Sequence, residues 1–176
     1  MKRYIVLIFI LLFIFISERN SFSQSSTSVT VTGQIFAEVM SVFAASETAQ
    51  LNFGKFSPGP QGGEIILTPS GSISVLGSIY KGNGVHNPAS FYVTGDVDAT
   101  FSISLPVNPV ILRHVSSSRT MLVDSWNSNP APGTGSGMLQ NGYQIVYVGA
   151  TLKVGTLNDN PVGIYTGSYQ ITFNFN

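Results

Sequence analysis

The chain contains no cysteine and very little charge, and both absences narrow what it can do. Without thiols it has no disulfide and no thiolate to bind a metal or attack a substrate. Charged residues make up 9% of its 176 residues, against about a quarter of an ordinary soluble protein. The formal net charge is zero, so the chain lacks the basic surface with which proteins bind nucleic acid. Stability must come from packing and backbone pairing.

Residues able to carry out chemistry are also scarce. The two histidines are His86, in a turn rich in Gly, Asn and Pro, and His114, at the end of a strand-like run. A metal site normally needs several His, Cys or carboxylate residues at close spacing, and a glycosidase needs two carboxylates across a cleft. The sequence offers neither pattern, so we expect a protein that is not an enzyme and holds no cofactor and no metal ion.

The first 23 residues have the pattern of a secretory signal peptide. A positively charged start precedes an unbroken apolar run from Tyr4 to Ile16, and Ser21 and Ser23 supply the small residues of a cleavage site. The alternative is a retained membrane anchor, but this run is shorter than the about twenty residues with which a helix spans a bilayer. We therefore expect a protein secreted to the periplasm or the cell surface, meeting a membrane only during export, with one mature domain at residues 24–176.

The mature chain predicts strands and turns rather than helices. About nine or ten short apolar runs are separated by breakers such as Ser57-Pro58-Gly59-Pro60. This spacing is typical of an antiparallel sandwich or barrel rather than of alternating strands and helices. The alternation of apolar and polar residues from Val29 onward predicts the first strand. Residues 127–137, rich in Gly, Pro, Ser and Asn, predict one long surface loop.

The last fourteen residues carry the clearest pattern. Their odd positions are Gly, aromatic or Ile, and their even positions are polar except for Ile164. Such alternation predicts one strand with one buried face, which should bend or split near Gly167 because glycine weakens a strand interior. A long apolar strand at a sheet edge invites pairing with other chains, so the protein either covers this strand or uses it to bind a partner. The residues on the apolar face are Gly163, Tyr165, Gly167, Tyr169, Ile171, Phe173 and Phe175.

The single tryptophan, Trp126, allows two interpretations. It follows the strand-like run that begins at Met121 and stands at the edge of the expected loop, beside Asn127 and Asn129. We favour a core residue that caps this strand. The alternative is an exposed aromatic ring that stacks on a sugar.

Several segments, taken in order, resemble the secreted bacterial family called domain of unknown function 4402. They are Leu51–Gly54, Gly62–Pro69, Phe91–Gly95, Phe101–Pro106, Val148–Leu152 and Gly163–Tyr169. That family is in turn similar to spore coat U and to fimbrial subunits assembled by a chaperone and an usher. The resemblance implies an immunoglobulin-like, pilin-like β-sandwich that lacks one strand and borrows it from a neighbour. The chain also resembles those fimbrial subunits at its end, where Gly163 is fourteenth from the last residue and Phe175 is next to last.

Two functions follow from these features. The first is a structural subunit of a fimbria or cell surface that assembles by β-strand addition. Its partners would be further copies of itself or related secreted subunits, and a periplasmic chaperone would bind it before assembly. Its candidate donor segment is the alternating run Val29, Val31, Gly33 and Ile35, and the competing interpretation is that these residues are the domain's own first strand. The second function is a self-complete binding module, for carbohydrate, with its site in the loops around Trp126.

Overall fold

The computed structural model describes residues 28–39 and 41–176, and residues 39–176 belong to one compact unit. The expected signal peptide at residues 1–23 and the expected mature N-terminus at Gln24 lie outside the described residues. Residues 28–38 belong to a separate unit, carry no strand and are exposed to solvent.

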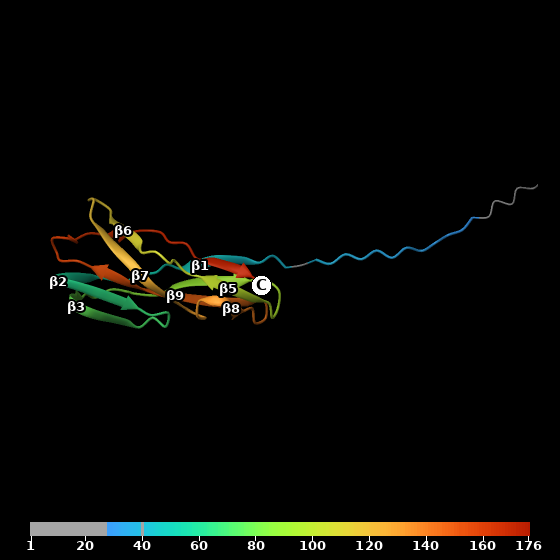
Figure 1. The fold of residues 1–176 in the computed structure, drawn as a ribbon, viewed down its shortest axis with the longest axis horizontal. Coiled ribbons are helices and arrows are strands. Elements are labelled where there is room, and N and C mark those ends of the chain that lie inside the picture. Colours follow the sequence, from blue (N-terminus) through green and yellow to red (C-terminus); the bar gives the residue numbers. More distant parts are fainter. Residues whose placement is uncertain (1–27, 40) are drawn as a thin grey trace, which may run out of the picture. The chain divides into compact units, whose positions relative to one another are not determined.

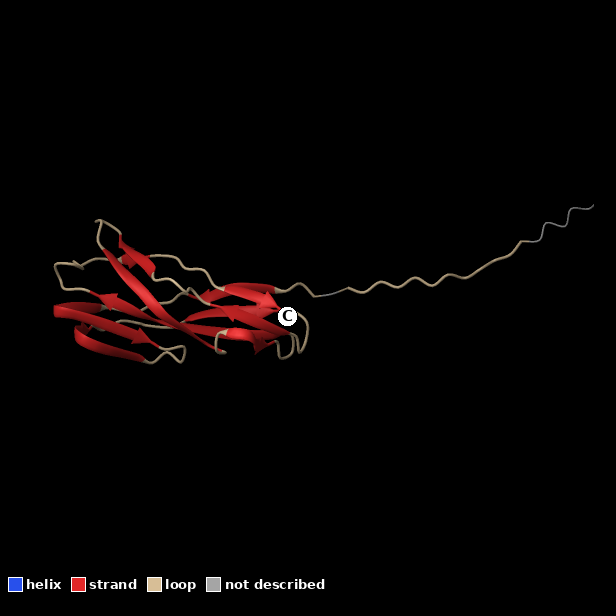
Figure 2. Cartoon of the chain, viewed as in Figure 1, coloured by secondary structure: helices blue, strands red, loops and turns tan. Residues whose placement is uncertain are grey.

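The regular structure of the described residues is entirely β, as Figure 2 shows. None of these residues belongs to a helix that is long and apolar enough to cross a membrane. The strands are β1 (Ala44–Ala49), β2 (Phe56–Leu67), β3 (Ile73–Lys81), β4 (Ala89–Thr94), β5 (Thr100–Ser104), β6 (Val110–His114), β7 (Thr120–Asn129), β8 (Gly133–Met138), β9 (Tyr143–Val154), β10 (Tyr165–Thr166) and β11 (Thr172–Phe175).

Eight strands form a large antiparallel sheet around β9, whose long, mostly buried run can pair on both sides (Figure 1). Its main order is β1-β4-β9-β7-β6-β10. The first half of β9 pairs with β4 and its second half pairs with β2, so β4 and β2 follow one another along the same flank of β9. The β2–β3 hairpin extends the sheet beyond β2. The strands β1 and β10 therefore stand at the two ends of the main order.

A small sheet, β11-β5-β8, completes the fold and covers one half of the interior. Phe101 and Ile103 of β5 pack there with Val93 of β4 and with Val146 and Val148 of β9. All of these side chains are buried, as is expected for the inward positions of strands that alternate along the chain.

The other half of the interior is built from the large sheet alone. Ile65 of β2, Met121 and Val123 of β7 and Leu152 of β9 form its buried cluster, to which the described part of the small sheet contributes no residue. The side chains packed over this cluster, such as Phe53, are only half-buried. One half of the core is therefore incompletely covered.

The all-β antiparallel fold predicted from the sequence is confirmed, but two local predictions are wrong. The strand expected from Val29 is absent, and the first strand of the described residues begins at Ala44. Alternation makes a segment suitable for a strand but does not supply the neighbour with which its backbone must pair. The long loop expected at residues 127–137 is mostly strand, since β7 runs to Asn129 and β8 begins at Gly133. Its glycines suit that place, because Gly137 lies directly against the ring of Phe101, where a side chain would not fit.

Candidate functional site

A cavity of about 1290 Å³ opens over the incompletely covered half of the core. One wall, which we call the first wall, is formed by residues 47–58, from the end of β1 to the start of β2. The second wall is formed by residues 160–171, which contain β10 and the chain that follows it. We refer to the space between these walls as the groove.

The two walls carry the two end strands of the large sheet. β1 pairs with β4 on one side, and β10 pairs with β6 on one side. Neither has a second neighbour among the described strands. The sheet is thus open between β1 and β10, and the groove lies at this opening. Edge strands with unpaired backbone groups are the places where sheets accept a further strand.

The floor of the groove is apolar and deep. It includes Met121, Val123 and Leu152, whose exposed fractions are only 4%, 2% and 2%. Val110 and Leu112 of β6 lie beside them and are half-buried. Because successive side chains of a strand point to opposite faces, the odd residues of β7 and the even residues of β6 turn inward here.

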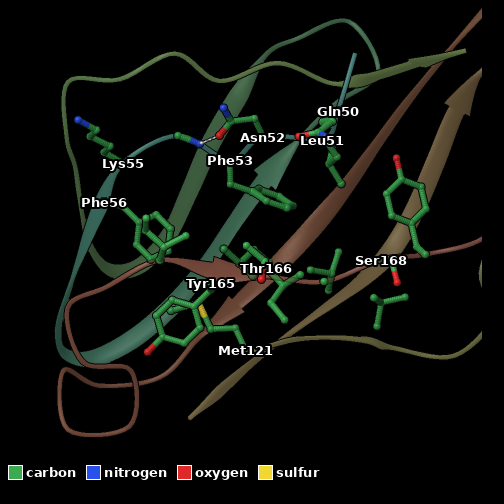
Figure 3. Close-up of a pocket in the computed structure, with 18 of the residues that line it drawn as sticks. Gln50, Leu51, Asn52, Phe53, Lys55, Phe56, Met121, Tyr165, Thr166 and Ser168 are labelled. Atoms are coloured by element: carbon green, nitrogen blue, oxygen red, sulfur yellow. Dashed lines mark hydrogen bonds between the residues drawn. The ribbon is translucent and has the colours of Figure 1, made fainter. Parts of the chain in front are cut away.

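Aromatic side chains reach into the groove from both walls. Figure 3 shows Phe53 and Phe56 of the first wall at the cavity, with Tyr165 of the second wall and Met121 of the floor below Phe56. In the same view Lys55 points away from the cavity. The groove therefore presents a largely apolar, aromatic interior, and the charged residues of its lining, Glu47 and Lys55, belong to the first wall.

Backbone and amide hydrogen bonds fix the first wall to the loop that precedes β4. Asn52 and Asn87 exchange two backbone hydrogen bonds of 3.0 Å, and the side-chain amide of Asn87 donates to the carbonyl of Gln50 at 2.7 Å. The side chain of Asn52 in turn accepts from the N–H of Gly54 at 2.8 Å (Figure 3). These bonds hold residues 50–54 in place although no regular strand continues there.

The start of the second wall is held by two side chains. Asn160 is buried; its amide donates to the carbonyl of Thr120 at 2.8 Å, and its oxygen accepts from the N–H of Gly155 at 2.6 Å. The ring of His114 lies against Gly163, with Nε2 3.1 Å from the carbonyl of Val162. A side chain at position 163 would collide with that ring, which explains why glycine stands at the beginning of the last strand.

The last strand has its predicted facing and its predicted break. Tyr165, Tyr169, Ile171 and Phe173 are half-buried on the inner side, while the polar residues between them are exposed. The strand divides into β10 and β11 around residues 167–171, and Gly167 lies close to the backbone of Ile111. Phe175 is the exception: it is predicted on the buried face but is exposed, at 43%, because it lies at the end of the chain, although its ring centroid is 5.4 Å from that of Phe43.

The predicted partner-face residues thus separate into two groups. Gly163, Tyr165, Tyr169 and Ile171 line the groove, whereas the cavity lining does not include Phe173 or Phe175. Phe173 instead packs on Phe91 and Phe101, in the core half that the small sheet covers. The candidate donor residues Val29, Val31, Gly33 and Ile35 lie in the separate unit and are exposed.

Trp126 lies in β7 and lines the groove, rather than standing in a surface loop. It is half-buried, contacts both halves of the core, and packs against Tyr169 with ring centroids 4.6 Å apart and ring planes inclined by 35°. Burial raises the pKa of the Tyr169 hydroxyl, and the negative charge of Glu47 on the first wall raises it further. The hydroxyl therefore stays protonated and able to donate a hydrogen bond.

Sequence reasoning missed the whole first wall and the role of Asn160. The signal for the wall was present in Leu51 and Phe53, whose spacing of two residues directs both side chains to one side of an extended chain. No pattern in the neighbouring sequence indicated that this segment lies opposite the C-terminal part of the chain. Among the residues that the structure describes, no group of three or more His, Asp or Glu side chains is placed to hold a metal ion.

Comparison with known protein families gives a match for the chain. The family model described as "Domain of unknown function (DUF4402)" matches residues 43–175, which span both sheets and both walls of the groove. No curated protein and no solved structure matches the chain.

Proposed function

This chain belongs to the DUF4402 family, and we propose that it is a secreted, non-enzymatic structural subunit that assembles by β-strand addition. In this proposal its two sheets are an immunoglobulin-like, pilin-like sandwich that lacks one strand. The groove receives a strand from a second copy, and repetition of this contact builds a fimbria-like or cell-surface polymer.

One observation carries the proposal: the two end strands of a single sheet face an apolar groove that separates them. A strand placed there would pair with a wall by its backbone and cover the floor with alternate side chains. A small-molecule site is usually smaller, about 300–1,000 Å³, and closes around its ligand. The length of the walls and the free sheet ends suit an extended peptide better.

The groove lining offers the energy for such binding. Phe53, Phe56 and Leu112 are half-buried, although full burial of a side chain of this size is worth about 1.5–3 kcal/mol. An inserted strand would therefore gain about 1 kcal/mol at each of these contacts, in addition to its backbone hydrogen bonds.

The occupant we propose is the segment 28–39 of a second copy. Val29, Val31 and Ile35 are 82%, 83% and 99% exposed, so their apolar side chains have no cover within the described part of their own chain. They alternate with Thr30, Thr32 and Gln34, so an extended segment would place its apolar side chains on one face. Its exposed apolar face complements the uncovered apolar groove.

Export and protection before assembly complete the proposal. The apolar run at residues 4–16 supports a signal peptide that directs the chain to the periplasm or cell surface. A chain with an open groove would aggregate unless something covers it, so a periplasmic chaperone that lends a strand is the partner we expect before assembly.

The alternative function is a self-complete carbohydrate-binding module with its site around Trp126. That function requires an aromatic ring free to stack on a sugar, whereas Trp126 is half-buried and packed against Tyr169. Binding of the monomer to a panel of glycans, lost in Trp126→Ala without loss of the thermal melt, would favour the module.

The test is removal of residues 24–34 from the mature protein, followed by thermal melting and light scattering. The matched control replaces the same residues by a Gly/Ser linker of equal length. We expect both variants to retain a cooperative melt and to remain monomeric, while the intact protein forms polymers that run as a ladder on an unheated denaturing gel. Loss of the melt would mean that the segment is a resident strand, and continued assembly of both variants would mean that another surface joins the copies.

A further inference from the structure

Two polar atoms on the groove lack a partner. Trp126 Nε1 and the Tyr169 hydroxyl are covered by protein atoms, yet neither makes a hydrogen bond with any described residue. Buried polar atoms without a partner are rare in folded proteins, because each loses its hydrogen bonds to water and gains nothing in exchange. Both atoms belong to one pair of rings that pack together in the groove, so we expect one cause for both.

Trp126 and Tyr169 lie at the position that a strand bound in the groove would occupy. Trp126 belongs to β7 and Tyr169 to the second wall, and both line the cavity. Other polar side chains of this region are satisfied: the Tyr165 hydroxyl donates to the carbonyl of Pro161 at 3.0 Å, and Asn160 makes two hydrogen bonds. The unsatisfied hydrogen bonds are thus confined to the point where the two rings pack together.

We infer that Trp126 and Tyr169 form a polar anchor that binds a neutral hydrogen-bond acceptor, a main-chain carbonyl, of the strand that enters the groove. This inference rests on the proposed function. An indole N–H can only donate a hydrogen bond and a protonated phenol donates readily, so both groups can be satisfied by an acceptor. A strand offers carbonyls at regular spacing along its edges.

Glu47 restricts the kind of acceptor. It lies on the first wall and its charge acts on the Tyr169 hydroxyl, so a carboxylate brought to the anchor would be repelled. A carbonyl carries no net charge and escapes this repulsion. The anchor therefore selects backbone, or an Asn or Gln side chain, over Asp or Glu.

Because Trp126 Nε1 and the Tyr169 hydroxyl are covered in the empty groove, the two rings must move apart when the strand enters.

Trp126 is the only tryptophan of the chain, so its fluorescence reports this movement without a label. In the experiment, a synthetic peptide with the sequence of residues 28–39 is titrated into dilute, monomeric mature protein. The emission of Trp126 and the thermal melt are both recorded.

Tyr169→Phe keeps the ring and removes the hydroxyl. We expect the peptide to bind this variant about fivefold more weakly, as for the loss of one hydrogen bond, while the empty variant melts at the same temperature or higher because an unsatisfied group has gone. Tyr165→Phe is the matched control on the same wall. Its hydroxyl already has a partner, so this variant should melt lower.

Each outcome has one meaning. If the peptide binds the wild type and Tyr169→Phe equally, the polar anchor is overturned and the proposed function stands. If the peptide shifts neither the emission of wild-type Trp126 nor the thermal melt, the proposed function itself fails. If Tyr169→Phe lowers the melt as Tyr165→Phe does, the hydroxyl is bonded in the empty domain and the inference fails.

Discussion

Phe173 meets Phe101 nearly edge-on, with ring centroids 6.0 Å apart and ring planes inclined by 69°. This contact fixes the end of the last strand to the small sheet, where β11 pairs with β5. The earlier part of the same strand, including Tyr165 and Tyr169, lines the groove. The last strand is thus fixed to the small sheet at its end, while its beginning faces the groove, where a further strand could pair with it.

Replacing Phe173 by Ala should therefore destabilise the domain strongly. Removal of an aromatic side chain from a core costs about 3–5 kcal/mol, and the partial exposure of Phe173 places the expected cost near the lower end. Thr172 is adjacent and exposed, so Thr172→Ala should change the stability by about 0.5 kcal/mol or less. Equal shifts of the melting temperature in the two variants would contradict the facing of this strand.

Asn160→Ala should loosen the start of the second wall. The substitution removes the hydrogen bonds to the carbonyl of Thr120 and from the N–H of Gly155, each worth about 0.5–1.5 kcal/mol. Asn158 is exposed in the same turn, so Asn158→Ala is the control and should melt like the wild type. The measurement is chemical denaturation, in which only the midpoint should move.

The last strand could be predicted from sequence because its information is local. A period of two places Tyr169, Ile171 and Phe173 on one face whatever the rest of the chain does. The break near Gly167 followed from the same local reasoning and is also confirmed. Trp126, favoured as a core residue, contacts both halves of the core.

The groove could not be predicted in the same way, because it depends on which segments meet. Residues 47–58 and 160–171 are far apart in the chain, and only the order of strands in the large sheet brings them to its two ends. The failures have the same origin. β8 is rich in glycine and became a strand because β5 pairs with it, whereas Val29–Ile35 has strand character and no described strand beside it.

Gly137→Ala should destabilise the small sheet. A β-carbon at this position would collide with the ring of Phe101, which is fully buried and has no space to move away. Such overpacking costs about 1–3 kcal/mol. Thr134 is exposed in the same strand, so Thr134→Ala should have little effect on the melting temperature. An unchanged melt for Gly137→Ala would show that β8 does not lie against Phe101.

The stability should depend on the ionisation of Asp159. The hydroxyl of Thr156 donates to its carboxylate at 2.7 Å and the backbone N–H of Thr156 donates at 3.1 Å, and both lower its pKa below the ordinary value of 3.8. A carboxyl with a lowered folded pKa contributes stability above its unfolded pKa and loses this contribution as the pH falls through the folded pKa. Asp159→Asn should therefore melt lower than the wild type at neutral pH, with the difference shrinking below pH 3.8. Thr156→Val should show the same pH dependence of its melting temperature. A difference in melting temperature from the wild type that stays constant with pH would contradict this account.

The final prediction separates the faces of the segment proposed to enter the groove. Ile35 belongs to its apolar face and Gln34 to its polar face, and both are exposed in the single chain. Ile35→Asp and Gln34→Asp introduce the same charge one residue apart, so neither should change the melting temperature of the monomer appreciably. In the groove, however, the carboxylate of the Ile35→Asp variant would be buried against apolar side chains without a partner, which is strongly unfavourable, whereas the carboxylate of Gln34→Asp would stay in water. Light scattering should show that Ile35→Asp abolishes polymer growth and that Gln34→Asp leaves it nearly unchanged. If both variants assemble equally well, the alternating face of residues 29–35 does not fill the groove.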